Sequence, residues 1–425
     1  MSNKMKTTLL AGTAAMLLAS CASSEKANKV KGDTAVAKVD NLKDVDSGYL
    51  IVSDAQREAI NKTNTFAFNL FRTQTGMDSK VVSPASVAYL MGMLANGANG
   101  DTRQQILKAL CMDGESLQTV NEAYRILLNK ASSDKQTTIS IANCIAVNRQ
   151  SAVKPEYAKQ MESLYDADVE NLDFASQKAV AAINDWCKRH TDGMIPKMID
   201  HLDAGNVAVL MNAIYFNGTW QHTFDKGLTK LDRFQGYTRD IKRVQMMWQN
   251  EKFRYAEKAD YAAVNLPYGD GNYSMTVILP NADKSVSDIA NALDAKKFAE
   301  LRKSMEDCIV DLKLPRFTTS SDIQLNEPVS KLGAPVIFQP GRADFSNIAN
   351  SAVYLSSMFQ KAKIDVSEEG TKAAAVTMGM VSMTALNPEE PRHVNFHANR
   401  PFIYVITENT TGAVFFIGQY TGSDI

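Results

Sequence analysis

Apolar residues recur with a helical period in the first third of this chain and with a strand period in its last third. From Ser53 onward they are spaced three and four residues apart, which predicts amphipathic helices. Ser53-Asp54-Ala55-Gln56 has the sequence of a capping box, and Ser83-Pro84 that of an N-cap followed by a first-turn proline. Further helices are predicted over Asp101–Leu110 and Leu117–Leu128.

The period changes to two at Ile139–Val147, which predicts the first long strand. The near-continuous apolar run Val207–Phe216 predicts a strand that is covered on both faces. Gly269-Asp270-Gly271 separates two strand-like segments and predicts a hairpin. Other strands are predicted at Val310–Leu314, Val394–His397, Phe402–Ile406 and Val414–Ile417. Helices early and strands late indicate an α+β fold, and no linker-like break divides residues 50–425, so we expect one large domain there.

The composition is that of a globular protein. The chain has 425 residues, 45% of them apolar and 22% charged, with a formal charge of −1. No basic stripe is present, so we expect no nucleic-acid partner. The sequence contains no G-x-S-x-G, H-E-x-x-H, Walker A or EF-hand pattern, so we expect no enzyme activity, cofactor or metal. His393 and His397 have the spacing of metal ligands, but Val394 and Phe396 between them favour a strand with polar histidines at a sheet edge.

The N-terminus has the features of an export signal. Lys4 and Lys6 precede the uncharged run Thr7–Ala19, which is too short to span a bilayer. Leu18-Ala19-Ser20-Cys21 resembles a bacterial lipobox, which implies a signal peptide over residues 1–20 and lipidation of Cys21. A plain signal peptide is the alternative. Residues 21–49 are small, polar and charged, so we expect a flexible tether. Because Ala22 is not the Asp that favours inner-membrane retention, we expect an outer-membrane lipoprotein, periplasmic or surface-exposed. The other cysteines show no paired spacing and are expected to be free thiols: Cys111, Cys144, Cys187 and Cys308.

The segment Glu368–Met383 follows an alternating run that predicts a half-buried strand ending near Gly370. Ala373–Pro388 has no charge, no aromatic residue and one glycine, so it is a poor permanent surface loop. An Ala/Met-rich helix is the alternative, which Gly379 and several β-branched residues disfavour. In an extended strand, one face would carry only small uncharged residues: Thr371, Ala373, Ala375, Thr377, Gly379 and Val381.

The pattern EEGT-x-AAA-x-T resembles the hinge of the reactive loop in inhibitory serpins. Further segments resemble that family in the same order, among them VVSPASVAYLMGMLANGANGDTRQQI, NAIYFNGTW, LPRFTTSSDIQL and NRPFIYVI. The resemblance implies the serpin fold, with helices packed around a large central β-sheet, two smaller sheets and an exposed reactive loop at about residues 368–390. The hinge residues that it implies are Glu368, Glu369, Gly370, Thr371, Ala373, Ala374, Ala375 and Thr377.

The same resemblance assigns polar residues beneath the sheet. Ser83, Ser86 and Asn212 match the shutter, where side chains hydrogen-bond below the strands that must part, and Trp220 matches the breach at the top of that sheet. Serpins usually have a histidine before the Lys-Ala pair of the loop-bearing strand, whereas Gln360 occupies that position here. A glutamine side chain can still both donate and accept hydrogen bonds.

Family spacing implies a scissile bond fourteen residues after Gly370, at Thr384-Ala385, with Met383 as the alternative cleavage residue. The implied activity is suicide inhibition of a serine protease, elastase-like first, with chymotrypsin-like serine proteases and papain-like cysteine proteases as further targets. Trypsin-like targets are not expected, because no Lys or Arg lies between Lys372 and Arg392. We expect a monomer. Two alternatives remain, a serpin-fold binding module that no longer inhibits and a surface lipoprotein enzyme.

Overall fold

Helices dominate residues 51–133 in the computed structural model, as the hydrophobic period predicts. The model describes residues 51–133, 137–371 and 391–423, which all belong to one unit. The α-helices are α1 Asp54–Arg72, α2 Pro84–Gly97, α3 Gly100–Ala109, α4 Leu117–Ser133, α5 Pro155–Tyr165, α6 Gln177–His190, α7 Val286–Ala292, α8 Ala295–Lys303 and α9 Asn326–Leu332; the 3-10 helices are η1 Lys226–Leu228 and η2 Pro335–Phe338. The predicted capping box is confirmed, because Ser53 Oγ accepts from the Gln56 N–H and Gln56 Oε1 from the Ser53 N–H.

Strands dominate the remainder of the described chain, so the predicted α+β class is confirmed. The strands are β1 Lys80–Val82, β2 Thr137–Asn148, β3 Asp168–Leu172, β4 Ala208–Thr219, β5 Lys230–Gln235, β6 Ile241–Glu257, β7 Tyr261–Tyr268, β8 Tyr273–Pro280, β9 Glu306–Pro315, β10 Phe317–Gln324, β11 Leu355–Ser367, β12 Gly370–Thr371, β13 Arg392–His397, β14 Phe402–Glu408 and β15 Val414–Tyr420.

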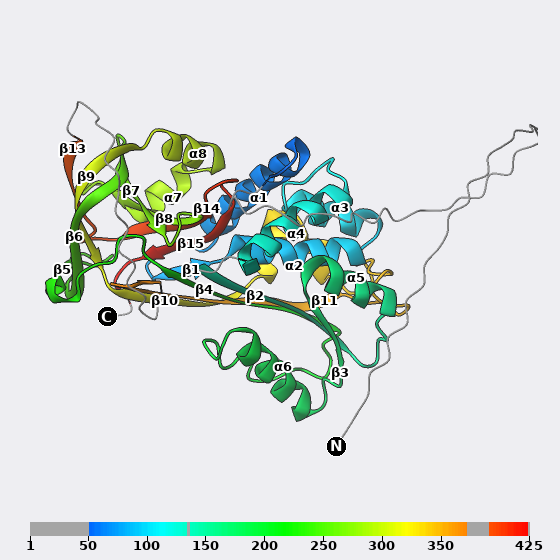
Figure 1. Cartoon of the computed structure of the whole chain (residues 1–425). Helices are drawn as coiled ribbons and strands as arrows, with labels where there is room; N and C mark the ends of the chain where they lie inside the picture. Colours follow the sequence, from blue (N-terminus) through cyan, green and yellow to red (C-terminus); the bar gives the residue numbers. More distant parts are fainter. Residues whose placement is uncertain (1–50, 134–136, 372–390, 424–425) are drawn as a thin grey trace, which may run out of the picture. The chain divides into compact units, whose positions relative to one another are not determined.

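The long strands form a six-stranded sheet in the order β10-β11-β12-β4-β2-β3. Its two central strands, β4 and β11, are parallel and paired directly from Leu355 to Lys363, while β2 runs antiparallel to β4 along its whole length. Helices cover both faces of this sheet, with α2 and α4 on one side and α6 on the other (Figure 1). Alternate residues of β4 therefore enter different cores: Leu210 and Ile214 pack on the α2 side, Met211 and Ala213 on the α6 side. The strand predicted to be covered on both faces is confirmed.

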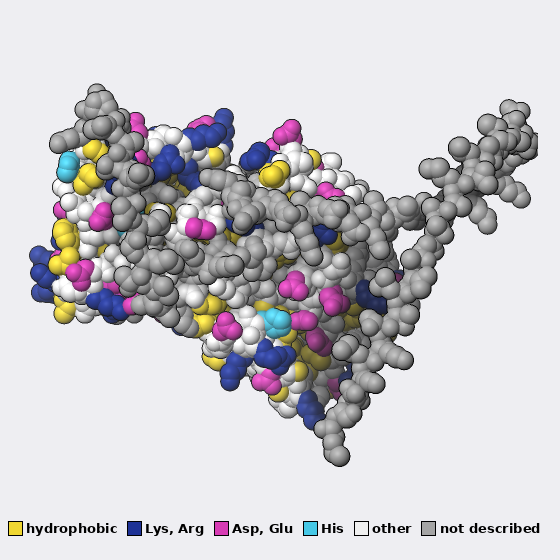
Figure 2. Space-filling view, viewed as in Figure 1, with side chains coloured by type: hydrophobic (Ala, Val, Ile, Leu, Met, Phe, Trp, Pro, Cys, Tyr) yellow, Lys and Arg dark blue, Asp and Glu magenta, His cyan; other side chains and the backbone are white. Residues whose placement is uncertain are grey.

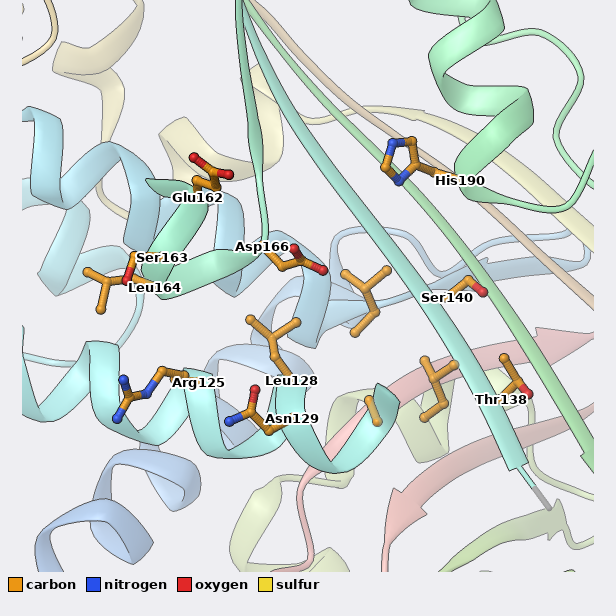
Figure 3. Close-up of a pocket in the computed structure, with 13 residues that line it drawn as sticks. Arg125, Leu128, Asn129, Thr138, Ser140, Glu162, Ser163, Leu164, Asp166 and His190 are labelled. Carbon is orange, nitrogen blue, oxygen red and sulfur yellow. The ribbon is translucent and has the colours of Figure 1, made fainter. Parts of the chain in front are cut away.

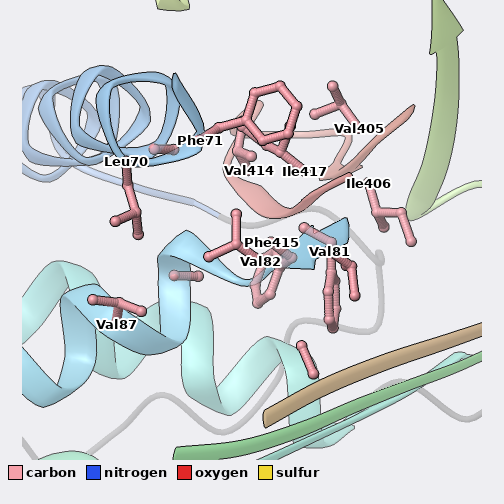
Figure 4. Packing of buried hydrophobic residues seen from close by; sticks show 14 of the residues in the cluster. Leu70, Phe71, Val81, Val82, Val87, Val405, Ile406, Val414, Phe415 and Ile417 are labelled. Carbon is pink, nitrogen blue, oxygen red and sulfur yellow. The ribbon is translucent and has the colours of Figure 1, made fainter. Parts of the chain in front are cut away.

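The second sheet has nine strands and contains β1-β15-β14-β8-β7-β6-β9-β13, with β5 also paired to β6. β6 spans 17 residues and pairs with β5 over Ile241–Met246, with β9 over Met246–Tyr255 and with β7 over Arg254–Glu257. The two smaller sheets of the expected fold are thus hydrogen-bonded into one through β6. Its strands β14 and β15 pack against α1 and α2, where apolar side chains such as Leu70, Val87 and Phe415 meet (Figure 4).

Several local expectations can be compared with the structure. The predicted strand through Ala362–Val366 exists, but the expectation that it continues to near Gly370 is wrong: β11 ends at Ser367 and the chain turns back. The four cysteines of the described residues are free thiols, as expected: Cys111, Cys144, Cys187 and Cys308. Within the described residues, no helix is long and apolar enough to cross a membrane. Lys and Arg side chains are interspersed with Asp and Glu on the face shown in Figure 2.

Candidate functional site

The start of the predicted hinge lies inside the six-stranded sheet. Beyond Ser367 the chain makes a two-residue turn at Glu368 and Glu369, and then Gly370 and Thr371 form β12. β12 is antiparallel to both of its neighbours, with Thr371 opposite Val366 of β11 and Gly218 of β4. At this end of the sheet β4 and β11 are therefore separated by one strand, whereas below it they pair directly with each other.

Gly370 is the position where the chain enters the sheet, and no other residue fits there. Its φ is +147°, a conformation that residues with a side chain rarely adopt. A Cβ at this position would lie 2.1 Å from the carbonyl oxygen of Gly218 and 2.7 Å from Thr219 Cα. Both contacts are with the backbone of β4, which cannot rotate away as a side chain can. Glycine thus allows the close approach of β12 to β4.

Thr371 is fully buried and faces the core, as the predicted inward parity requires. Its Oγ1 lies 2.7 Å from the hydroxyl of Tyr268, which burial keeps protonated by raising its pKa well above the ordinary value. The Tyr268 ring stacks on Trp220, with ring centroids 4.3 Å apart and an interplanar angle of 13°. Trp220 Nε1 donates to the carbonyl oxygen of Ser367 at 2.9 Å. The predicted breach residue therefore binds the end of β11 directly and is linked to Thr371 of β12 through Tyr268.

The backbone of the turn is anchored by the chain that follows β4. The N–H of Trp220 donates to the Glu369 carbonyl at 2.9 Å, and the N–H of Phe224 donates to the Glu368 carbonyl at 2.8 Å. Ser367 Oγ adds a hydrogen bond to the Gly370 carbonyl at 3.1 Å. With these acceptors satisfied, the turn can lie against the sheet without a desolvation penalty.

The two glutamates of the turn differ in environment. Glu368 is only 1% exposed; its Oε1 accepts from Thr229 Oγ1 at 2.8 Å and its Oε2 from Arg316 Nε at 3.2 Å. Burial alone raises the pKa of the Glu368 carboxyl, but hydrogen bonds from its own N–H and from Thr229, with the Arg316 charge, outweigh burial and lower the pKa below its ordinary value. Glu369 forms an ion pair with the largely exposed Lys226.

The four predicted shutter residues come together in one buried hydrogen-bond network. Ser83 Oγ donates to the Phe415 carbonyl at 2.7 Å and lies 3.2 Å from Ser86 Oγ, within hydrogen-bond distance. Gln360 on β11 accepts from the Ser83 N–H at 2.8 Å and donates to the Ser83 carbonyl at 3.0 Å and to Asn212 Oδ1 at 2.9 Å. Asn212 on β4 then donates to Asn143 Oδ1 on β2 at 3.0 Å.

Gln360, Asn212 and Asn143 lie directly opposite one another on three neighbouring strands, and we call these three residues the polar row. The row crosses the line along which β4 and β11 are in contact. Gln360 uses both its carbonyl oxygen and its NH₂ group, so the residue that departs from the usual histidine still links α2 to both central strands.

Other parts of the predicted site lie outside the described residues, namely Cys21, Ala373, Ala374, Ala375, Thr377, Met383, Thr384 and Ala385. Three contacts were missed from the sequence: Thr229, Arg316 and Tyr268 all touch the hinge, but only the folded chain brings them there. The LPRFTTSSDIQL segment contains Arg316 and could have drawn attention to it.

A cavity of about 500 Å³ opens between α4, β2 and α5, with His190 of α6 at its border (Figure 3). Arg125 and Asn129 project from α4, and Glu162 projects from α5. The residues that line this cavity include exposed charged side chains of both signs and aliphatic side chains, without a nucleophile placed next to a base. Within the described ranges, no group of three or more His, Cys, Asp or Glu residues could hold a metal ion.

Comparison with known proteins bears on this arrangement. The leukocyte elastase inhibitor of Sus scrofa is 32% identical over 382 residues, which cover 85% of this chain and 99% of that protein. Plasminogen activator inhibitor 1 of Neovison vison is 32% identical over 392 residues, covering 87% and 96%. The crystal structure of the thermophilic serpin tengpin in the native state matches with a TM-score of 0.79 at 29% identity, covering 88% of this chain and 96% of that one.

A complex of thyroxine-binding globulin with thyroxine matches with a TM-score of 0.77, covering 86% of this chain and 99% of that one; at 23% identity this likeness shows the fold alone. The predicted serpin fold is confirmed by these neighbours. The family model described as Serpin (serine protease inhibitor) matches residues 61–422. The chain therefore belongs to the serpin family of serine protease inhibitors.

Proposed function

We propose that this protein inhibits a serine protease as a suicide substrate, by inserting its cleaved reactive loop into the six-stranded sheet. The observation that carries the proposal is the position of β12, which already separates β4 from β11 at one end of the sheet. The strands below it are still paired with each other from Leu355 to Lys363. A cleaved loop that follows β12 would extend this separation along the sheet.

The register of β12 specifies which residues would meet during insertion. Thr371 is opposite Val366 and Gly218, and each further step of two residues along the loop moves the partners by two residues along β11 and β4. In this register Thr377 would lie between Gln360 and Asn212. Insertion would break the direct Gln360–Asn212 hydrogen bond, and the Thr377 hydroxyl could replace it on both sides.

The chemical step requires the protease to treat the loop as a substrate. Its serine oxygen attacks the carbonyl carbon of Thr384, the bond to the Ala385 nitrogen breaks, and the released amine takes a proton from the protease's general acid. An ester then links Thr384 to the protease. Insertion of the freed hinge carries this acyl-enzyme along the sheet and distorts it before water attacks the ester.

Insertion is favoured because each new strand residue gains backbone partners on both sides. The small inward residues of the hinge matter because an unpaired charge in this core would cost several kcal/mol, of the order of a broken buried ion pair. The polar row opposes opening, since β4 and β11 cannot part without breaking its central hydrogen bond. It therefore holds the sheet closed until cleavage.

An elastase-like protease is the proposed target. Two observations support it: similar proteins are leukocyte elastase inhibitors, and Thr384 has a small side chain that suits a shallow specificity pocket. Cleavage after Met383 would extend the range to chymotrypsin-like enzymes, and papain-like proteases are further candidates. We also propose that the chain acts as a monomer, anchored to the outer membrane through lipid on Cys21.

A binding module that does not inhibit is the second candidate, because the same fold is found in thyroxine-binding globulin. Thr371 and the small, uncharged hinge residues after it favour inhibition, since a charged or bulky hinge is what such a module would tolerate.

The two candidates are separated by mixing the protein with pancreatic elastase. Inhibition predicts a protein–protease complex that survives boiling in SDS. The released C-terminal peptide, identified by mass spectrometry, should begin at Ala385 or Thr384. Elastase whose active-site serine is blocked is the control and should give no complex. Complete cleavage without any SDS-stable complex would contradict the proposal.

A further inference from the structure

A second cavity, of about 220 Å³, lies on the nine-stranded sheet at the end of α8. It is lined by two arginines, two asparagines and one methionine: Arg254, Asn265, Arg302, Met305 and Asn409. These residues come from β6, β7, α8, the segment after α8 and the loop between β14 and β15. None of them belongs to the hinge or to the polar row.

Both guanidinium groups are held in place by only part of their hydrogen-bonding capacity. Arg254 Nη2 donates to the carbonyls of Arg302 and Met305, each at 3.0 Å, and so caps the carboxyl end of α8. Arg302 Nη2 donates to Asn409 Oδ1 at 2.8 Å. The Nε and Nη1 groups of both arginines make no hydrogen bond with the described residues. Gly412 leaves room beside Arg302, because a Cβ there would lie 3.2 Å from Nη1.

The acceptor atoms around the cavity are already used. Asn265 Oδ1 accepts from Thr276 Oγ1 at 3.0 Å, and Asn409 Oδ1 accepts from Ser274 Oγ at 2.7 Å as well as from Arg302. Asn409 also donates its NH₂ group to the Gly271 carbonyl. The Asn265 NH₂ group and the remaining guanidinium N–H groups are left, whereas Asn265 Oδ1 keeps one lone pair, so the side-chain groups still available are mainly donors.

The charge of the two arginines is not cancelled by an ion pair. In the described part of the chain, no carboxylate lies within 4.0 Å of Arg254 or Arg302. Asp307, which is opposite Arg254 on β9, binds Lys252 instead at 2.8 Å. Many arginines at protein surfaces are solvated and bind no ligand. Arg254 and Arg302 differ from these because few hydrogen-bond acceptors lie around the cavity that they line.

The buried carboxylate of Glu408, the last residue of β14, acts electrostatically on Arg302 but is hydrogen-bonded to the turn that follows it. Its oxygens accept from the Thr410 N–H at 2.9 Å and from the N–H and hydroxyl of Thr411. Burial lowers the pKa of Arg302; Glu408 raises it in part and the like charge of Arg254 lowers it further. A ligand that brings negative charge would relieve both of the unfavourable effects.

We propose that this cavity binds a small oxyanion through Arg254, Arg302 and the amide group of Asn265, namely a phosphate or sulfate group, either free or attached to a small molecule. Planar guanidinium groups suit such anions because they donate paired hydrogen bonds. The cavity is smaller than the roughly 300–1,000 Å³ of sites for drug-sized ligands, which favours a small ligand. The proposal is independent of protease inhibition.

The test measures binding of inorganic phosphate, sulfate and glucose 6-phosphate to the intact protein by titration calorimetry, at constant ionic strength set with chloride. Saturable binding at one site per chain is expected. The probe that binds with the highest affinity shows whether the ligand is free phosphate, free sulfate or a phosphate group attached to a small molecule. Arg302→Gln and Asn265→Asp should each weaken binding at least about tenfold, because each removes a charge-assisted or amide donor. Asn265→Asp keeps the acceptor for Thr276 and is nearly isosteric, so the fold should be retained.

Lys303→Gln is the matched control, because Lys303 is an exposed cation next to Arg302 that does not line the cavity. This variant removes the same charge and should change the affinity less than about twofold, as expected for screened surface charges. Absence of saturable binding of all three probes would overturn the proposal. So would equal weakening by Lys303→Gln and Arg302→Gln, which would indicate a general surface effect, or unchanged affinity in Asn265→Asp.

Discussion

Replacing Glu368 by glutamine tests whether the buried carboxylate anchors the turn at which the hinge enters the sheet. The change keeps the size of the side chain but removes its charge. Thr229 would keep an acceptor, whereas Arg316 would lose its ionic partner. The Arg316 side chain is 48% exposed and can return to water, so the loss should lie below the ~3–5 kcal/mol of a fully buried pair. We expect a destabilisation of about 1–3 kcal/mol.

The matched control is Glu369→Gln, which removes the neighbouring carboxylate. Glu369 pairs with Lys226, whose side chain is 64% exposed, so this variant should lose only about 0–1 kcal/mol. The measurement is the midpoint of unfolding in urea at pH 7, followed by tryptophan fluorescence. Equal losses in the two variants would refute the claim that the buried glutamate is the anchor.

The dependence on pH gives a second check. The pKa of Glu368 is lower in the folded protein than its ordinary value of 4.5, so the folded state favours the ionised form. Its stabilisation is therefore fully present above pH 4.5 and is lost as the pH falls through the folded pKa. Because glutamine does not titrate, the stability gap between the wild type and Glu368→Gln should narrow on acidification. If the stability difference between the wild type and Glu368→Gln stayed constant as the pH fell below 4.5, the result would contradict an ionic contribution of Glu368.

Three further variants, each with a matched control, address the hinge and the polar row. Gly370→Ala places a Cβ 2.1 Å from a backbone oxygen and should displace β12 from the sheet at a cost of roughly 1–3 kcal/mol or more, whereas Gly76→Ala meets no atom within 4 Å and should be neutral in the same thermal unfolding assay. Gln360→Met leaves buried partners unsatisfied and should lower the free energy of unfolding by about 3 kcal/mol, while Gln324→Met, at an exposed position, should not. Thr371→Arg should abolish the SDS-stable complex and leave a cleaved substrate, and Thr371→Ser should retain the complex; unchanged complex formation by the arginine variant would count against insertion.

Local signals in the sequence predicted much of the fold. The first helix begins directly after Ser53 because its cap is made by residues three positions apart, and such short-range chemistry is visible in any sequence. The near-continuous apolar run Val207–Phe216 likewise specified a strand buried on both faces. The family pattern placed Ser83 and Gln360 in one site, although no local rule brings them together across 277 positions.

The end of β11 could not be predicted by such rules. Alternation would have continued to Gly370, but the turn at Glu368 is determined by N–H groups of Trp220 and Phe224, which come from a distant part of the chain. The same holds for Arg316, whose distance from Glu368 is set by the pairing of β10 with β11. Long-range register, rather than local propensity, decided where the hinge begins.

The central claim is that the intact protein is held in a state of higher free energy than the cleaved, loop-inserted state. The most direct measurement compares thermal unfolding of the intact protein with that of the protein cut once between Met383 and Ala385. We predict that the cleaved form unfolds at a markedly higher temperature, because the inserted loop adds a full strand between β4 and β11. Equal unfolding temperatures for the two forms would contradict the account.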